Sequence, residues 1–260
     1  MLLAIDINNK NTNFGVFDED KIITKFSIMT DRNRSTEEVK LILKLILKDR
    51  NIMLEDIDDI ILSTVVPELY QNYEIISINL IGKKPKIISA GVKTGLNIKC
   101  ESPRDVGSDR IIRAVAATNK YKDNLIIISA SSITTIDYIN AKKEFLGGLI
   151  FPGVNLLQKS LVRESSKLPQ VEIKSCKDIL GNNTEKAIQS GIYFGYKNAV
   201  SGVINEIFKK YSLNKKNTQI LTTGIYANLL DNNEFEFVEE EMLGLEGLKI
   251  IYDLNKNKAS

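Results

Sequence analysis

The chain has 260 residues, which suggests about two domains, and its hydrophobic fraction of 43% and charged fraction of 26% are ordinary for a globular protein. Because 35 basic side chains nearly balance 33 acidic ones, there is no electrostatic case for nucleic acid, and no apolar run approaches the ~18 residues of a membrane span. Histidine is absent, which excludes a Ser/His/Asp triad, a histidine general base and a histidine metal centre.

Short apolar segments separated by polar turns open the chain. We predict the first three strands at Leu2–Asp6, Phe14–Phe17 and Lys21–Ser27. This pattern is typical of an antiparallel meander. A helix is predicted to begin at Ser35, because this possible N-cap is followed three residues later by Glu38 as its capping-box partner. Asp59–Val66 then predicts a buried strand that stops at Pro67.

A second meander is predicted in the middle of the chain. After a helix at Asp109–Tyr121, three strands are predicted at Asn124–Ser129, Thr135–Asn140 and Glu144–Leu149. The remaining elements are helices at Gly153–Arg163, Thr184–Tyr211 and Leu243–Leu254, and strands at Lys86–Ser89 and Gln219–Thr223. Short strands mixed with helices indicate an α/β fold. The two meanders indicate two domains of similar design, which we place at residues 1–115 and 116–260.

The turn after the first strand is a candidate phosphate loop. Asp6 ends the strand, and the tight polar turn 7–11 follows it. A carboxylate beside such a turn can orient a magnesium ion, while backbone N–H groups face phosphate. Because such loops usually use glycine for left-handed backbone, we expect Asn8, Asn9 and Asn11 to take that conformation here. Taken alone, the turn fits an ordinary polar hairpin better.

A second candidate is Gly107-Ser108-Asp109-Arg110, at the start of a predicted helix. Asp109 can accept the proton of a substrate hydroxyl as that hydroxyl attacks phosphorus, while Arg110 balances charge near the phosphates. A carboxylate at a helix N-terminus is also an ordinary cap, and for the isolated turn that interpretation is strong.

Two later turns can face a nucleotide. Ser129–Thr135 carries five hydroxyls in seven residues, which suits a phosphate-facing loop because hydroxyls and main-chain N–H groups both donate. Thr222-Thr223-Gly224 ends a predicted strand, where a base or ribose can pack. Each segment alone also fits an ordinary turn.

Together and in order, these segments resemble the type III pantothenate kinases over almost the whole chain. The most specific pieces are Gly91–Lys99 and Pro103–Arg110, which are similar to the family's pantothenate-site segment. Similar stretches also occur at Asp31–Arg34, Ser63–Pro67, Leu146–Gly153, Lys167–Pro169, Gly181–Thr184 and Leu245–Leu248. A chance match of so many ordered pieces is improbable.

The resemblance implies an actin/hexokinase-like fold, with two ribonuclease-H-like domains around a central cleft, and a homodimer. It implies ATP-dependent phosphorylation of pantothenate, the first step of coenzyme A biosynthesis, with Mg²⁺ and a monovalent cation, K⁺ or NH₄⁺. By this likeness Asp109 is the catalytic base. The implied ATP-binding residues are Asp6, Ile7, Asn8, Asn9, Lys10, Asn11, Thr12, Asn13 and Ser132. The implied substrate-binding residues are Gly107, Ser108, Asp109, Arg110, Thr184 and Cys100.

Several positions depart from the family pattern. In the first loop, Asn8 replaces a glycine and Lys10 a threonine. In the second, Ser129 replaces an aspartate, which puts the monovalent-cation site in doubt because hard cations favour charged oxygen ligands. Cys100 replaces a tyrosine that packs against pantothenate, and Ile225 replaces a glycine and can crowd the adenosine pocket. One hypothesis is that the point charge of Lys10 partly takes over the cation's role.

Three functions stay open. An active pantothenate kinase is favoured by intact Asp6, Asp109 and Arg110, since positioning and charge stabilisation make up most of phosphoryl transfer. The second is a catalytically impaired relative that binds a ligand or regulates another protein. The third is a kinase for another hydroxyl substrate, which Cys100 would favour by opening the pocket. The lack of a signal-peptide pattern and the two unspaced cysteines predict a cytoplasmic location.

Overall fold

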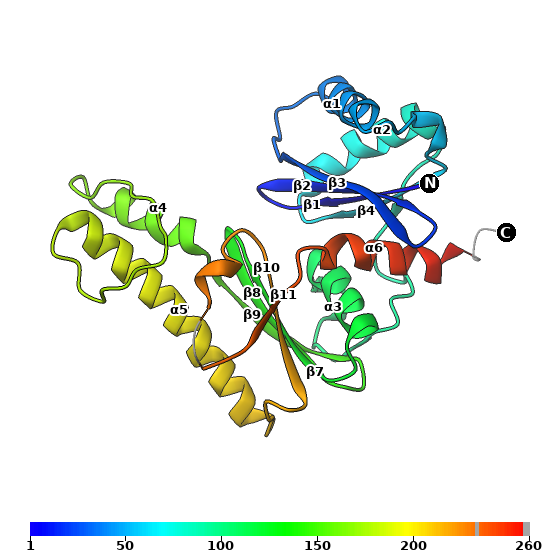
Figure 1. Cartoon of the computed structure of the whole chain (residues 1–260). Coiled ribbons are helices and arrows are strands. Elements are labelled where there is room, and N and C mark those ends of the chain that lie inside the picture. Colours follow the sequence, from blue (N-terminus) through cyan, green and yellow to red (C-terminus); the bar gives the residue numbers. More distant parts are fainter. Residues whose placement is uncertain (232–233, 257–260) are drawn as a thin grey trace. The chain divides into compact units, whose positions relative to one another are not determined.

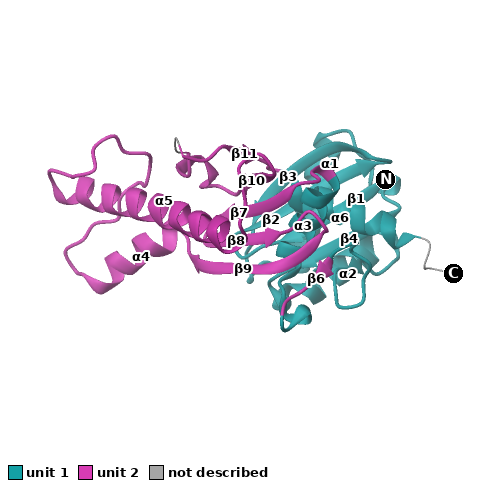
Figure 2. Cartoon of the chain, turned by 90° about the horizontal axis from the view of Figure 1, so that it is seen from below, with its two compact units in different colours: residues 1–96, 101–119, 242–260 teal, residues 97–100, 120–241 magenta. Residues whose placement is uncertain are grey.

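The computed structural model describes residues 1–231 and 234–256 and divides into two compact units, which Figure 2 colours separately. Unit 1 comprises residues 1–96, 101–119 and the C-terminal segment from residue 242. Unit 2 comprises residues 97–100 and 120–241. This division differs from a single boundary between residues 115 and 116, because the chain returns to unit 1 for its last helix.

A five-stranded sheet forms the centre of unit 1, in the order β3-β2-β1-β4-β5 (Figure 1). Its strands are β1 (Leu2–Ile7), β2 (Asn11–Asp18), β3 (Lys21–Met29), β4 (Asp59–Thr64) and β5 (Lys86–Ile87). The first three form the predicted antiparallel meander, and β4 joins β1 in parallel. Every residue of β1 is buried, as expected of a central strand that is covered on both faces.

Helices cover both faces of this sheet. On one face, α1 (Thr36–Asp49) and α2 (Tyr70–Ile81) share a hydrophobic core with Leu3, Ile5 and Ile7 of β1. On the other side, as Figure 1 shows, α6 (Leu243–Leu254) contacts β1 and β4. Because side chains alternate along a strand, Asp6 points away from that core and toward the side of α6.

Two glycines bring the last helix close to its neighbours. A Cβ at Gly244 would lie 3.0 Å from Oδ2 of Asp6. A Cβ at Gly247 would lie 1.9 Å from the carbonyl oxygen of Ile112, which belongs to α3 (Ser108–Lys120). A larger residue at position 247 would therefore push α6 away from α3. The side of the sheet that holds Asp6 is thus walled by α3 and α6.

Unit 2 repeats this arrangement around a six-stranded sheet, in the order β11-β10-β7-β8-β9-β6. Its strands are β6 (Asn97–Ile98), β7 (Asn124–Ala130), β8 (Ile133–Ile139), β9 (Glu144–Pro152), β10 (Thr218–Thr223) and β11 (Phe237–Glu239). β7, β8 and β9 form the second predicted meander, and β10 joins β7 in parallel as β4 joins β1. The helices of this unit are α4 (Val154–Glu164) and the 27-residue α5 (Thr184–Lys210). Among the described residues, short 3₁₀ turns occur at Leu54–Asp56, Pro67–Leu69, Pro103–Asp105 and Ala227–Leu229.

Local signals in the sequence account for some element boundaries and miss others. The capping box before α1 is confirmed, since the backbone N of Glu38 donates to Oγ of Ser35 at 3.3 Å and the N of Ser35 donates to Oε2 of Glu38 at 2.7 Å. The sequence does not predict α2, because no side chain caps its start and Leu69 occupies the N-cap position.

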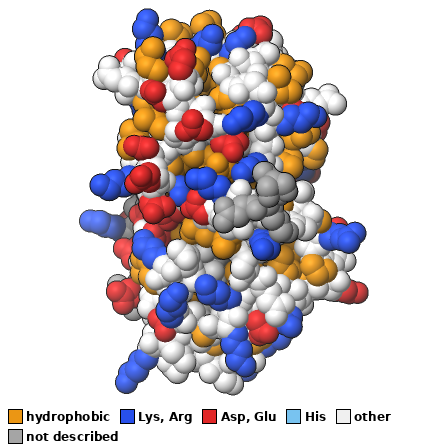
Figure 3. Space-filling view, turned by 90° about the vertical axis from the view of Figure 1, so that its right-hand side faces the viewer, with side chains coloured by type: hydrophobic (Ala, Val, Ile, Leu, Met, Phe, Trp, Pro, Cys, Tyr) orange, Lys and Arg blue, Asp and Glu red, His pale blue; other side chains and the backbone are white. Residues whose placement is uncertain are grey.

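The charged surface and the helices also bear on possible partners. On the face drawn in Figure 3, basic and acidic side chains are interspersed. In the parts of the chain that the structure describes, no helix has the length and apolar character that a membrane crossing needs.

Candidate active site

Asp6 is the penultimate residue of β1, in register with Asn13 on β2 and Ser63 on β4. It is only 3% exposed. Its Oδ2 accepts a hydrogen bond from Nδ2 of Asn8 at 2.7 Å, whereas its Oδ1 is buried without a hydrogen-bond partner among the described residues. Because burying an unpaired polar atom is costly, Oδ1 is a candidate for contact with a ligand.

The surroundings of Asp6 shift its ionisation toward neutral pH. Burial raises the pKa of Asp6 to about 6, because removal from water disfavours the charged form. The positive charge of Arg113 and the amide of Asn8 oppose this rise in pKa, and the negative charge of Asp109 adds to it. Asp6 and Asp109 therefore influence each other within unit 1.

Hydrogen bonds tie the start of α3 to the end of β4. Ser108, the first residue of α3, accepts a hydrogen bond on its Oγ from Oγ of Ser63 at 2.9 Å. The same Ser108 hydroxyl donates to the carbonyl oxygen of Thr64 at 3.1 Å. Because Ser63 lies beside Asp6 in the sheet, these bonds bring the first turn of α3, with Asp109, to the strand end that carries Asp6.

Arg113 lies one helical turn after Asp109 and is missed by the sequence analysis. Its Nη2 donates to Oδ2 of Asp109 in an ion pair whose side chains are 8% and 17% exposed, respectively. The spacing of four residues on a helix is the signal that predicts such a pair. Asp109 therefore has one oxygen bound to a nearly buried guanidinium.

Gly107 leaves room for the carboxylate of Asp109. A Cβ at position 107 would lie 2.7 Å from Oδ1 of Asp109, closer than real Cβ atoms come to other atoms. Arg110 is partly buried, and its backbone N donates to the carbonyl oxygen of Gly107 at 3.0 Å. Gly107, Ser108, Asp109 and Arg110 thus form one turn at the start of α3.

The hairpin between β1 and β2 does not use left-handed backbone. The expectation that Asn8, Asn9 and Asn11 adopt positive φ is wrong, since none of the three does so. Instead, the backbone N of Asn8 donates to the carbonyl oxygen of Asn11 at 3.0 Å, and Oγ1 of Thr30 donates to the carbonyl oxygen of Asn8 at 2.8 Å. Asn8 therefore fits the loop without backbone strain, and its side-chain amide is available to bind Asp6.

In unit 2, the turn between β7 and β8 occupies the corresponding place in its sheet. Ser129 is the penultimate residue of β7, in register with Thr135 on β8 and Thr223 on β10. Oγ of Ser132 and Oγ1 of Thr135 are buried and lack hydrogen-bond partners among the described residues. Hydroxyls in this condition fit the oxygens of a phosphate group, to which they can donate.

Two glycines pack against this turn. A Cβ at Gly153 would lie 1.9 Å from the carbonyl oxygen of Ser131. A Cβ at Gly224, whose φ is +96°, would lie 2.5 Å from the carbonyl oxygen of Ala130. Both positions need glycine because backbone approaches backbone there. Ile225, which follows, is 55% exposed.

The other two candidate residues lie on separate elements of unit 2. Thr184 is the exposed first residue of α5, directly after the N-cap Asn183, whose Oδ1 accepts from the backbone N of Lys186 at 2.9 Å. Cys100 is partly buried and follows β6, the strand at one edge of the sheet. Neither belongs to the turn that holds Ser132.

The described residues contain no group of three His, Cys, Asp or Glu side chains that could hold a metal ion. Magnesium needs no such group, because it keeps several waters and usually binds through one or two carboxylates and the phosphates of a substrate. Oδ1 of Asp6, buried and unpaired, suits that kind of binding.

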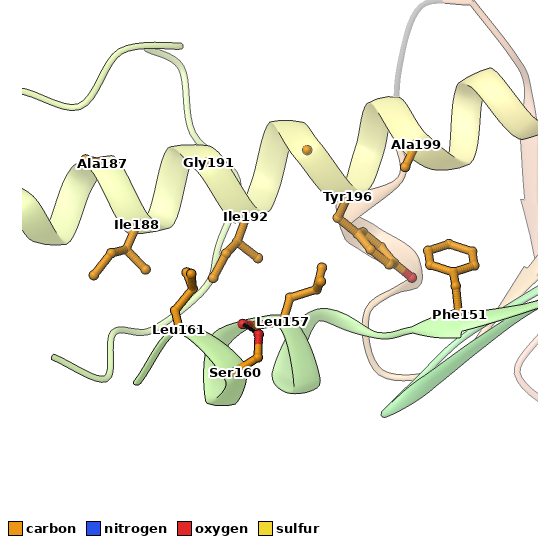
Figure 4. A pocket seen from close by; sticks show the side chains of 11 residues that line it. Phe151, Leu157, Ser160, Leu161, Ala187, Ile188, Gly191, Ile192, Tyr196 and Ala199 are labelled. Carbon is orange, nitrogen blue, oxygen red and sulfur yellow. Dashed lines mark hydrogen bonds between the residues drawn. The ribbon is translucent and has the colours of Figure 1, made fainter. Parts of the chain in front are cut away.

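A groove of about 450 Å³ runs along α5 in unit 2 (Figure 4). Apolar side chains from β9, α4 and α5 line it, among them Phe151, Leu157, Leu161, Ile192 and Tyr196. None of the candidate ATP- or substrate-binding residues is among its lining residues. The groove is therefore an apolar feature in addition to the candidate active site.

Comparison with protein families and known sequences gives one consistent result. The family model for type III pantothenate kinase matches residues 2–206. A type III pantothenate kinase of Exiguobacterium sibiricum is 38% identical over 257 residues, which cover 98% of this chain and 100% of that protein. A type III pantothenate kinase of Geobacter sulfurreducens is 36% identical over 259 residues, which cover 98% of this chain and 100% of that protein.

Comparison with solved structures bears on the fold alone, because the identities are low. A Campylobacter jejuni protein, provisionally assigned as a Baf family transcriptional activator, has a TM-score of 0.58 and 21% identity and covers 98% of this chain and 99% of its own. A Sinorhizobium meliloti protein, provisionally assigned as a 2-dehydro-3-deoxygalactonokinase, has a TM-score of 0.60 and 10% identity, with coverages of 97% and 98%. The predicted actin/hexokinase-like fold class is confirmed by such neighbours and by the repeated sheet arrangement.

Replacement of Asp6 by asparagine should change how stability depends on pH. Because the pKa of Asp6 is raised to about 6 in the folded chain, the folded state holds a proton that the unfolded state releases between pH 4 and 6. The free energy of unfolding of the native protein should therefore fall as pH rises through this window, by up to about 3 kcal/mol from this group.

Urea denaturation of the native chain and of Asp6→Asn at pH 4.5 and 7.5 measures this effect. We expect Asp6→Asn to gain stability relative to the native chain at pH 7.5, where the native carboxylate is charged. A stability difference that is the same at both pH values would contradict the raised pKa.

Proposed function

The chain belongs to the type III pantothenate kinase family and phosphorylates pantothenate in the first step of coenzyme A biosynthesis, and we propose that Asp109 is the general base of this reaction. The observation that supports this role most is the ion pair with Arg113, which fixes Oδ2 of Asp109 in unit 1, where the charge of Asp109 also acts on Asp6. A general base must lie within hydrogen-bond reach of the proton it removes, so a fixed carboxylate suits the task.

In the proposed mechanism, the hydroxyl oxygen of pantothenate attacks the γ-phosphorus of ATP. A bond forms between these two atoms, the bond from the γ-phosphorus to the bridging oxygen breaks, and ADP leaves. The hydroxyl proton moves to the carboxylate of Asp109. Arg110, on the same turn, supplies positive charge near the transferred group, because most of this catalysis is positioning and charge stabilisation.

We assign the phosphates of ATP to two turns. In unit 1, we assign the phosphates to the segment Asp6–Asn13, and the unpaired Oδ1 of Asp6 would hold the magnesium ion. In unit 2, the buried hydroxyl of Ser132 donates to a phosphate oxygen. When bound with ATP, magnesium supplies positive charge to the phosphate oxygens during transfer.

We assign pantothenate to the turn Gly107–Arg110, with Cys100 and Thr184 as further contacts. Cys100 is partly buried and much smaller than the tyrosine of the family pattern, so it would leave more room for a substrate there. Thr184 is exposed at the first turn of α5, where its hydroxyl can reach a substrate bound to a second subunit.

The family's monovalent cation, K⁺ or NH₄⁺, would lack its charged ligand in this chain. The position of its carboxylate ligand is Ser129, which brings no charge. Lys10 lies exposed in the first phosphate loop, and its carbonyl oxygen accepts a hydrogen bond from the N of Thr30 at 2.7 Å. We propose that the ammonium of Lys10 supplies part of the positive charge that the cation would bring.

We also propose that the protein is a cytoplasmic homodimer. In the apolar groove along α5, Leu161 is exposed, and so are Leu156 and Val162 on the same helix α4; a second copy of the chain would cover these side chains. Exposed apolar patches of this kind mark association surfaces. The two free cysteines favour a reducing compartment such as the cytoplasm.

Replacement of Asp109 by asparagine should lower kcat by at least roughly 100-fold, because the amide cannot accept the hydroxyl proton. The measurement is pantothenate-dependent release of ADP with magnesium and ATP. Asp49→Asn, at the exposed end of α1, is the matched control and should leave kcat unchanged. If folded Asp109→Asn kept native kcat, Asp109 would not be the base. If the native protein itself showed no turnover, the ligand-binding or regulatory alternative would be supported.

Replacement of Gly107 by alanine should lower kcat by ~10- to 100-fold, because the new Cβ displaces the carboxylate of Asp109 from its position. The control is Gly202→Ala in the middle of α5, where a Cβ meets no atom within 4 Å. Steady-state kinetics with pantothenate test both variants. Native kcat in Gly107→Ala would show that the position of Asp109 does not limit the reaction.

Replacement of Leu161 by aspartate should convert the proposed dimer to a monomer, because a charge would be buried in the apolar contact. Light scattering coupled to size-exclusion chromatography gives the mass. The control is Leu41→Asp on α1, where the native side chain is 57% exposed, against 38% for Leu161. A native protein that is monomeric at micromolar concentration would rule out the homodimer.

A further inference from the structure

Arg113 is a buried arginine whose role in the reaction no sequence motif indicates. It is 7% exposed and lies on α3, on the same face of the helix as Asp109, to whose Oδ2 it donates. A nearly buried ion pair adds little to stability on average, because the attraction between the charges barely repays their removal from water. A gain in stability therefore does not explain why Arg113 and Asp109 form a buried ion pair.

The charge of Arg113 acts on both carboxylates of the candidate active site. It binds Asp109 directly, and it lowers the pKa of Asp6, which the charge of Asp109 raises. Two carboxylates brought close together oppose each other's ionisation unless a cation offsets them. Arg113 is the cation that the structure provides to both.

The hydrogen bond to Arg113 also selects one oxygen of Asp109. Because Oδ2 is bound to the guanidinium, Oδ1 is the oxygen left to accept a proton. Oδ1 lies against Gly107, within the turn that we assign to pantothenate. The position of Arg113 one helical turn inside α3 thus sets the orientation of the carboxylate at the start of that helix.

We propose that Arg113 is a positioning residue for phosphoryl transfer, whose guanidinium holds Asp109 in one orientation and offsets the negative charge that Asp109 and Asp6 bring together. This inference rests on the proposed role of Asp109. A planar guanidinium suits the task better than an ammonium, because its fixed donors orient a carboxylate as well as attract it.

The test compares Arg113→Lys and Arg113→Gln with the native full-length chain. We expect Arg113→Gln to lower kcat by roughly 100-fold and the KM for pantothenate to change less than about threefold, since the loss falls on the transition state. Arg113→Lys keeps the positive charge but lacks the planar, fixed donors of a guanidinium, so it should have an intermediate kcat. Arg163→Gln, at a side chain that is 79% exposed, is the matched control and should behave as the native chain.

A second measurement separates positioning from a merely structural role. In Arg113→Ala, guanidinium ion added at millimolar concentration should restore part of kcat, because it can occupy the space of the lost side chain. Urea at the same concentration, which has a similar shape and no charge, should not. Circular dichroism shows whether each variant is folded. If Arg113→Gln and Arg113→Ala do not fold, the kcat of Arg113→Lys still tests the proposal.

The outcomes distinguish this inference from the proposed function. If the native protein is active and folded Arg113→Gln keeps its kcat, only the proposed role of Arg113 is overturned. Equal rescue of Arg113→Ala by guanidinium and urea would have the same meaning. Loss of kcat in Arg113→Gln with native kcat in Asp109→Asn would overturn it too, because Arg113 would then act without the base. Absence of turnover in the native protein would overturn both.

Discussion

A carboxylate buried at the end of a central strand is costly to ionise, and the arrangement of unit 1 around Asp6 follows from that constraint. The amide of Asn8 binds one oxygen of Asp6, and the positive charge of Arg113 offsets part of the penalty of burial. Gly244 lets α6 close over the same carboxylate. What is left unsatisfied is Oδ1, the atom on which a ligand can act. Asp6 therefore lowers the stability of the folded chain at neutral pH, as a buried charge with an unpaired oxygen does.

Unit 2 uses the same arrangement of strands without a charge at the equivalent position. Ser129 stands on β7 where Asp6 stands on β1, each with partners on an antiparallel and a parallel neighbour. Its turn offers the hydroxyls of Ser132 and Thr135, which are buried and unpaired. At this strand position, unit 1 therefore has a buried carboxylate, whereas the turn of unit 2 has buried hydroxyls.

The sequence predicts the parts of this structure that have local causes. The two meanders follow from alternating apolar runs and polar turns, and the start of α1 follows from the Ser35 capping box. The pairing of β1 with β4 and the return of α6 to unit 1 are long-range contacts, which no local pattern encodes. The sequence predicts the motif around Asp109, but it does not predict the hydrogen bond between Asn8 and Asp6. Asn8 stands where the family pattern has a glycine, and the loop does not need the left-handed backbone that a glycine there would suggest.

If the ammonium of Lys10 supplies the positive charge of the monovalent cation, as proposed, this kinase works without that cation. The most direct measurement is mass-spectrometric detection of 4′-phosphopantothenate formed from pantothenate and magnesium ATP, in buffer with tetramethylammonium as the monovalent cation. We expect product in this buffer, with little stimulation by added potassium. Product that forms only when potassium or ammonium is present would contradict this expectation, because a bound cation, and not Lys10, would then supply the charge.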